Sequence, residues 1–162
     1  FTESNCKVIA MDKIKQNING IKIIPLRQIN DERGAVYHVL NSTDSHFTKF
    51  GEAYFSKINS GVVKAWKYHK EMTQNFSVPY GKLKLVCFDS REDSATYGII
   101  TVLFLDPDEN YNLIQVPPKI WYGFQCISKQ DCLLLNIADI SHDPYESMSE
   151  GINSSSIKYK WR

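Results

Sequence analysis

The chain has 162 residues, with 19 basic and 18 acidic side chains and a formal net charge of +1. That length accommodates one domain with a substantial core. The composition, 43% hydrophobic and 23% charged, is that of a globular protein and excludes a disordered chain. The balanced charge argues against a nucleic-acid partner. No apolar run approaches the roughly 18 residues of a membrane span, so no membrane partner is expected.

Short apolar segments separated by turns follow one another along the chain. We expect strands at residues 20–26, 35–40, 51–58, 61–69, 73–79, 82–89, 99–105, 112–117, 120–127, 131–139 and 157–161. The stretch INDERG is expected to be a turn, SREDSATYG a loop, and residues 149–156 a surface loop. Lys82 and Lys84 alternate with leucines, which predicts a solvated face. The best helical candidate is at residues 10–16.

Turns at intervals of about 8–12 residues are typical of β-sandwiches and barrels, and we favour a double-sheet jelly roll. We expect a single domain over residues 1–162, with 1–19 as an N-terminal extension and 20–161 as the barrel and closing segment. Such barrels bind ligands in the mouth between their sheets. The cysteines form no CxxC pair, and Cys87, Cys126 and Cys132 lie in apolar stretches. We therefore expect free thiols in a reduced, cytoplasmic protein.

The strand GVVKAWKYHK carries the most informative pattern. Strict alternation would place Lys67 and His69 on one face and Lys64 with Trp66 on the other. Cations gathered at a barrel mouth suit an anionic ligand such as a diphosphate, and aromatic side chains beside them suit a flat ring or a sugar. The residues that could converge in this way are Arg33, Lys64, Trp66, Lys67, His69, Trp121 and Tyr122. The competing interpretation is a set of solvated edge residues and core aromatics.

Other chemistries lack their signatures. The four histidines, His38, His46, His69 and His142, show no ligand spacing, and a transition metal needs three or four ligands. We therefore expect no metal. The chain has no GxSxG elbow, no GxGxxG and no P-loop, so we expect neither a nucleophile elbow nor a glycine cradle for a nucleotide. No cofactor is expected.

Four motifs occur in a familiar order: DERG at 31–34, GVVKAW at 61–66, DSREDSATYG at 89–98 and VPPKIWYGF at 116–124. They resemble the DxRG, GVLRGLH, DxRxxSPTFG and IPxGFAHGF motifs of the dTDP-4-dehydrorhamnose 3,5-epimerase family. The resemblance runs from about residue 20 to 161. It implies a cupin jelly roll (a double-stranded β-helix), a homodimer, and a nucleotide-diphosphate sugar as substrate without a metal. It also implies a role in making surface-polysaccharide sugars.

The chemistry of that family removes an acidic proton beside a keto group with a base and returns one from an acid. The resemblance places the family's base histidine at Lys67 and its acid tyrosine at or near Leu135. It places the histidine of the HGF motif at Tyr122 and a lysine of the family near Gln74. The carboxylate that orients the base comes, in longer members, from a tail that this chain lacks. The chain therefore resembles a divergent member without the usual His/Tyr pair.

The catalytic candidates are Lys67, His69 and Tyr122. Lys67 could be the base, or a fixed cation that only binds anions, or His69 could have taken over as the base. His69 could also point to solvent. The predicted substrate-binding residues are Arg33, His38, Lys64, Trp66, Gln74 and Trp121.

The predicted function is epimerisation or isomerisation of a 4-keto-6-deoxy, or related keto, nucleotide sugar. Two alternatives stay open. One is a catalytically inactive sugar-binding paralogue or partner subunit, and the other is a 3,4-ketoisomerase.

Overall fold

A computed structural model describes residues 17–162, and the expected helix at residues 10–16 lies outside them. All regular elements of the described residues are strands, so none of them is a helix that could span a membrane. The strands are β1 (Lys22–Pro25), β2 (Gln28–Asp31), β3 (Gly34–Tyr37), β4 (Glu52–Ile58), β5 (Val63–His69), β6 (Gln74–Tyr80), β7 (Leu83–Asp89), β8 (Ile100–Leu105), β9 (Asn112–Val116), β10 (Ile120–Cys126), β11 (Cys132–Ala138) and β12 (Ser147–Ser149).

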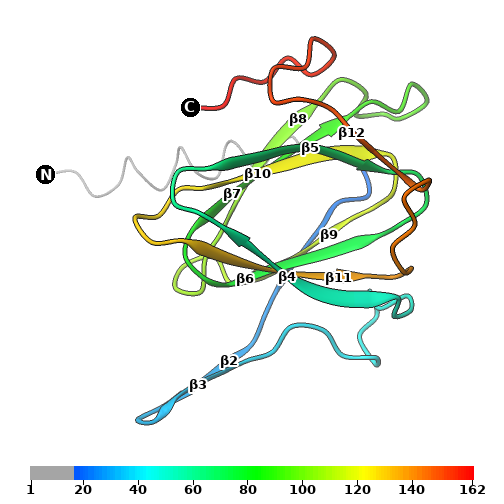
Figure 1. Ribbon diagram of the computed structural model, residues 1–162. Helices are drawn as coiled ribbons and strands as arrows, with labels where there is room; N and C mark the ends of the chain where they lie inside the picture. The colour runs from blue at the N-terminus through cyan, green and yellow to red at the C-terminus, as the bar shows by residue number, and fades with distance from the viewer. Residues whose placement is uncertain (1–16) are drawn as a thin grey trace, which may run out of the picture.

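Two five-stranded antiparallel sheets face each other (Figure 1). One has the order β1-β9-β6-β11-β4 and the other β12-β5-β10-β7-β8. From β4 to β7, and again from β8 to β12, the chain crosses to the opposite sheet at every connection. This alternation is the topology of a jelly roll, and it confirms the predicted all-β architecture.

The strands β2 and β3 form a separate hairpin that projects away from the two sheets (Figure 1). The predicted turn INDERG, residues 29–34, therefore includes the last three residues of β2 and the first residue of β3 as well as the turn itself. Asp31 accepts hydrogen bonds from the backbone N–H and the guanidinium of Arg33, which closes the turn. Gly34 follows with a φ of 144°, a value that favours glycine.

Alternation along β10 separates two apolar clusters. The side chains of Ile120, Tyr122 and Phe124 belong to the interior core between the sheets. Trp121 belongs to a second cluster with Trp66, Val86 and Ile157 on the outer face of the β5–β10–β7 sheet. A site inside the barrel would therefore lie next to the interior core. The outer cluster holds the C-terminal segment against the sheet.

The C-terminal segment differs from the prediction. Residues 157–161 form no strand; Ile157 is buried, and Tyr159 and Trp161 pack against the outer cluster. Lys84, expected in solvent, lies under this segment with its Nζ 5.4 Å from the centre of the Trp161 ring. Apolar side chains without a ladder partner bury themselves on the nearest apolar face, and here that face is the outer side of the sheet.

Candidate active site

The pairing of β5 with β10 decides which way the charged residues of β5 face. Tyr122 lies opposite Lys67, but the next residue, Gly123, lies opposite Ala65, so Trp66 is the extra residue of a bulge. Gly123 permits this close approach, because a Cβ there would come within 2.5 Å of the Ala65 Cβ.

The bulge breaks the simple alternation that the sequence predicted. Lys64 lies opposite Phe124 and Lys67 opposite Tyr122, and both aromatic partners belong to the interior core. Because residues opposite each other on neighbouring strands share a face, Lys64 and Lys67 both start on the interior side. Trp66 instead packs outside. The predicted grouping of Lys64 with Trp66 was therefore wrong.

His69, the last residue of β5, is buried between two polar partners. Its Nδ1 lies 2.6 Å from Oε2 of Glu146, and its Nε2 lies 3.0 Å from the hydroxyl of Tyr122. The exposed fractions of His69, Glu146 and Tyr122 are 7%, 7% and 5%. His69 does not point to solvent, which excludes one of the readings that the sequence left open.

Glu146 reaches His69 because of the strand that follows it. β12 pairs with the end of β5, with Ser147 opposite His69, so Glu146 lies beside the imidazole. Its Oε1 accepts hydrogen bonds from the backbone N–H groups of Glu71 and Met72, at 2.8 and 2.9 Å. One carboxylate thus binds the chain after β5 through one oxygen and His69 through the other.

The electrostatics favour a carboxylate, a neutral imidazole and a neutral phenol. Burial opposes the charge on Glu146, but the hydrogen bonds from Glu71, His69 and Met72 outweigh it, and its pKa lies below the ordinary value. Burial lowers the pKa of His69 despite the opposing effect of Glu146, and the charge of Lys67 lowers it further. Burial raises the pKa of Tyr122 well above the ordinary value.

These protonation states fix the direction of both hydrogen bonds. A carboxylate can only accept, so Nδ1 of His69 carries the proton and donates it to Glu146. Nε2 is then the lone-pair nitrogen and accepts the hydroxyl proton of Tyr122. The result is a directed chain, Glu146–His69–Tyr122, in which a proton arriving at the phenol oxygen can pass to the imidazole.

The opposite sheet contributes two more polar side chains. Gln74 on β6 is buried, and its Nε2 lies 3.5 Å from Nε2 of His69 while its Oε1 has no hydrogen-bond partner. Tyr54 on β4 lies opposite Asn136. Burial raises the pKa of Tyr54 and a hydrogen bond with Gln74 opposes this, while the Tyr54 charge in turn raises the pKa of Tyr122. Tyr54, 41% exposed, and the buried Tyr122 lie on opposite sheets of the barrel.

Four predicted binding residues are not brought to His69 within one chain. Trp66 and Trp121 pack in the outer cluster, Trp66 against Tyr159 and Trp161, and Trp121 against Tyr68. The bulge turns Trp66 outward, and normal alternation from Tyr122 turns Trp121 outward.

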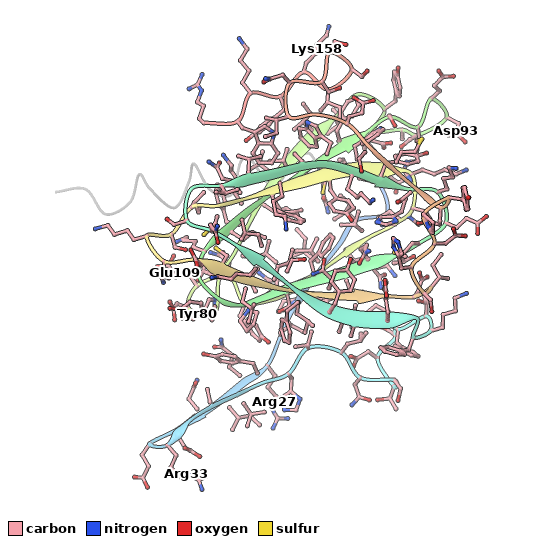
Figure 2. The ribbon with its side chains drawn as sticks, viewed as in Figure 1. Arg27, Arg33, Tyr80, Asp93, Glu109 and Lys158 are labelled. Carbon is pink, nitrogen blue, oxygen red and sulfur yellow. The ribbon has the colours of Figure 1, made fainter. Side chains whose placement is uncertain are left out.

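Arg33 lies at the tip of the projecting hairpin, with 83% of its side chain exposed (Figure 2). His38 follows the hairpin and is exposed. The hairpin carries Arg33 away from the barrel (Figure 2), so the expected convergence of Arg33 on the barrel mouth does not occur within one chain. His38 stays at the base of the hairpin, where its carbonyl accepts the Tyr111 hydroxyl.

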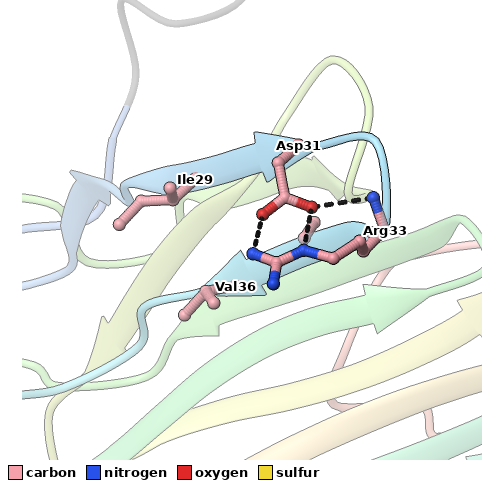
Figure 3. A pocket seen from close by; sticks show the side chains of 6 residues that line it. Ile29, Asp31, Arg33 and Val36 are labelled. Carbon is pink, nitrogen blue, oxygen red and sulfur yellow. Dashed lines mark hydrogen bonds and ion pairs between the residues drawn. The ribbon is translucent and has the colours of Figure 1, made fainter.

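Two hollows of the described surface also lie elsewhere. One, of about 310 Å³, is on the hairpin between Ile29, Arg33 and Val36 (Figure 3). The other, of about 290 Å³, is lined by Arg27, His38, His46 and neighbouring residues. Neither contains His69 or Tyr122. Residues 17–162 hold no group of three or more His, Cys, Asp or Glu side chains arranged for a metal ion.

Within one chain, two of the sequence motifs shape loops. The DERG turn pairs Asp31 with Arg33, as described above. In DSREDSATYG, the fully buried Asp89 accepts hydrogen bonds from Arg91, Ser94 and Thr96. These donors overcome the effect of burial and hold the pKa of Asp89 far below its usual range. The carboxylate is therefore the anchor of this loop.

Sequence reasoning missed Glu146. The resemblance placed the orienting carboxylate in a tail that longer members of the family have, yet a residue 77 positions after His69 occupies that role in space. No motif marks it; the only local signal is the Asp143-Pro144 turn, in which Asp143 accepts a hydrogen bond from the Tyr145 N–H. At the position of the family's acid tyrosine the chain has leucines, with Leu134 in the core and Leu135 half-buried.

Comparison with known proteins identifies the family. A model described as dTDP-4-dehydrorhamnose 3,5-epimerase matches residues 15–162. The chain belongs to the dTDP-4-dehydrorhamnose 3,5-epimerase family. This confirms the resemblance and makes the protein a member of a family of sugar epimerases and isomerases.

Individual relatives agree with the family assignment. A dTDP sugar isomerase from Desulfovibrio desulfuricans G20 superposes with a TM-score of 0.87 and 39% identity, over 89% of this chain and 92% of that one. The probable low-salt glycan biosynthesis epimerase Agl13 of Haloferax volcanii is 32% identical over 136 residues, 83% of this chain and 86% of its own length. The spore coat polysaccharide biosynthesis protein SpsL of Bacillus subtilis is 27% identical over 146 residues, 89% of this chain and 96% of its own.

Proposed function

We propose that this epimerase-family protein epimerises or isomerises a keto nucleotide sugar, of the 4-keto-6-deoxy class, by deprotonating the carbon beside the carbonyl. The observation that carries the proposal is the buried Glu146–His69–Tyr122 chain. A neutral imidazole that can accept a proton, an oriented proton path and a carboxylate behind the imidazole are what general acid–base catalysis at carbon requires.

The proton route follows from the directed hydrogen bonds. The Tyr122 oxygen takes the proton from the sugar carbon while its own hydroxyl proton passes to Nε2 of His69. The products are an enolate, a neutral phenol and an imidazolium, which the Glu146 carboxylate stabilises at 2.6 Å. Reversal of the same transfers returns a proton to carbon.

Inversion requires the returning proton to reach the other face of the enolate. The Tyr54 phenol approaches from the opposite sheet, and its pKa is raised by burial, so it is protonated at neutral pH. We assign Tyr54 as the donor for that face and Tyr122 as the group that takes the first proton. The Tyr54 phenolate, 41% exposed, then regains a proton from solvent, and the His69 imidazolium releases its extra proton to solvent, which resets the site.

Lys67 supports this chemistry as a fixed cation. It is half-buried and lies opposite Tyr122, and no carboxylate within salt-bridge distance of it is found among residues 17–162. A positive charge there stabilises a developing enolate and keeps His69 neutral, because it lowers the pKa of His69. Lys64, exposed one bulge away, suits the diphosphate of the substrate. Buried Gln74, with a free Oε1, suits a sugar hydroxyl.

A second copy of the chain completes the protein as a homodimer. The β2–β3 hairpin exposes Ile29, Val36 and Tyr37 at 41%, 57% and 38%, and an isolated hairpin is only marginally stable in water. β4 is an edge strand with Phe55 exposed at 59%. A partner copy that covers these apolar surfaces would also place its projecting hairpin against this chain. The Arg33 of one copy could then contact the substrate bound in the barrel of the other copy.

Deuterium exchange tests the proposal. The protein is incubated with a 4-keto-6-deoxy nucleotide sugar in D2O, and deuterium at C3 and C5 is followed by NMR. Exchange and inversion are expected. His69→Gln should abolish exchange, whereas Lys67→Gln should slow it while leaving measurable turnover. Binding of the nucleotide sugar without any exchange would overturn the proposal in favour of a silent binding module, and full exchange by His69→Gln would remove His69 from the mechanism.

A further inference from the structure

Two buried thiols meet at the end of the barrel away from His69. Cys126 ends β10 and Cys132 begins β11, with residues 127–131 as the loop between them. Their sulfur atoms are 2.6 Å apart, and the residues are 0% and 1% exposed. His69 lies at the other end of the β5–β10 ladder, because the Cys126 carbonyl accepts the Gly61 N–H ahead of β5.

We propose that Cys126 and Cys132 are a disulfide-forming site, oxidised by a small-molecule disulfide of the glutathione type. One thiolate attacks the small disulfide, forms a mixed disulfide and releases one small thiol. The second cysteine then displaces the other small thiol as the protein S–S bond forms. Two protein S–H bonds are lost, both protons leave, and the two electrons reduce the small disulfide to two thiols.

The surrounding structure holds the two sulfurs together. The Ser128 hydroxyl lies 3.4 Å from the sulfur of Cys126 and 3.5 Å from that of Cys132. Behind Cys132, the backbone at Gly81 is so close that an added Cβ would lie 2.9 Å from the sulfur. The backbone at Gly81 therefore limits the movement of the Cys132 sulfur on the side away from Cys126. The third cysteine of the described residues, Cys87, lies on β7 and is buried in the same interior core.

The bond would close the end of the barrel from which β5 starts. The loop between the cysteines already binds the β4–β5 turn, since Asp131 accepts the Ser60 N–H and the Ser128 carbonyl accepts the Ser60 hydroxyl. Burial, together with the neighbouring Cys126, raises the pKa of Cys132 to about 11, so its thiolate is scarce at neutral pH. We therefore expect the bond to form during folding, before the loop closes over the sulfurs, and to raise the melting temperature of the oxidised protein by about 5 °C.

Peptide mapping of the whole protein tests the site. The protein is refolded in a glutathione redox buffer, remaining thiols are alkylated, and trypsin is added. Trypsin cuts after Lys129, between the two cysteines, so the bond joins peptides 120–129 and 130–158. This linked pair and a melting temperature higher than that of the reduced protein are expected. Alkylation of both cysteines, or bonds to Cys6 or Cys87 in comparable yield, would overturn the proposal.

Variants separate the pair from general oxidation. Cys126→Ser and Cys132→Ser should each lose the linked peptides and the redox-dependent rise in melting temperature. Cys87→Ala, the matched control, should keep both. Equal melting temperatures for the oxidised and reduced wild-type protein would show that the disulfide does not stabilise the fold. This measurement uses only the wild-type protein, so it does not require any variant to fold.

Discussion

Glu146→Gln is the sharpest perturbation of the proposed mechanism. The substitution keeps the shape of the side chain and removes its charge. The backbone N–H groups of Glu71 and Met72, at 2.8 and 2.9 Å, still need an oxygen, so they orient the new amide with its NH2 group toward His69. A donor then faces Nδ1, which must become the acceptor. The imidazole proton moves to Nε2, the nitrogen that has to receive the proton from Tyr122.

The size of the effect follows from the lost interaction. A hydrogen bond to a charged group contributes about 1.5–3 kcal/mol, and each 1.36 kcal/mol of transition-state stabilisation is a tenfold change in rate. The exchange rate at saturating substrate should therefore fall by about 10- to 150-fold. KM should change little, because Glu146 is buried behind His69 and does not reach the substrate. Removing the carboxylate also removes the interaction that opposes burial, so the pKa of His69 should fall further.

The assay is the rate of solvent deuterium exchange as a function of pH. Exchange requires neutral His69, so the wild-type rate rises with pH through the pKa of His69. In Glu146→Gln this acid limb should shift to lower pH while the plateau drops. Glu71→Gln is the control, because it also removes one negative charge, but from an exposed side chain. Glu71 binds Glu146 only through its backbone N–H, which the substitution keeps. A plateau within twofold of the wild type, with an unmoved acid limb, would refute the role of Glu146.

Four further predictions follow from the same structure. Tyr122→Phe should retain nucleotide-sugar binding, measured by calorimetry, but lose about 100-fold or more in exchange rate, because the proton path to His69 is cut. Tyr54→Phe should keep exchange and slow inversion, so that deuterium enters the recovered substrate with its configuration unchanged; equal loss of both would contradict the assignment of Tyr54. Because folding depresses the pKa of His69 below 6.5, the unfolded chain binds a proton first as the pH falls from 7, so the free energy of unfolding by urea should decrease below about pH 6.5, and His69→Gln should flatten this part of the curve. Gly123→Ala should lower the free energy of unfolding by about 1–3 kcal/mol, because its Cβ would lie 2.5 Å from that of Ala65; an unchanged unfolding curve would show that the bulge relaxes freely.

Local patterns in the chain were enough to predict most of the strands. Apolar segments bounded by turn residues gave the positions of β4 to β11 to within one or two residues, because a strand that packs one face on a core must alternate or be apolar along its length. The missed strands, β2 and β12, are short and polar. The wrongly predicted one, residues 157–161, has the composition of a strand but no ladder partner. Backbone pairing is a property of two segments, and one segment alone does not reveal it.

The sequence by itself determined which side chains were available: a histidine near the end of a central strand, a tyrosine at the HGF position, and lysines on the same strand. Only the tertiary structure decided which of them meet. A one-residue bulge at Trp66 turned Lys64 inward and the tryptophan outward, and pairing of β12 with β5 brought Glu146 to His69 across 77 positions. The direction of a side chain depends on the register between two strands, and a proton path depends on contacts between distant segments. Neither can be predicted from any single stretch of residues.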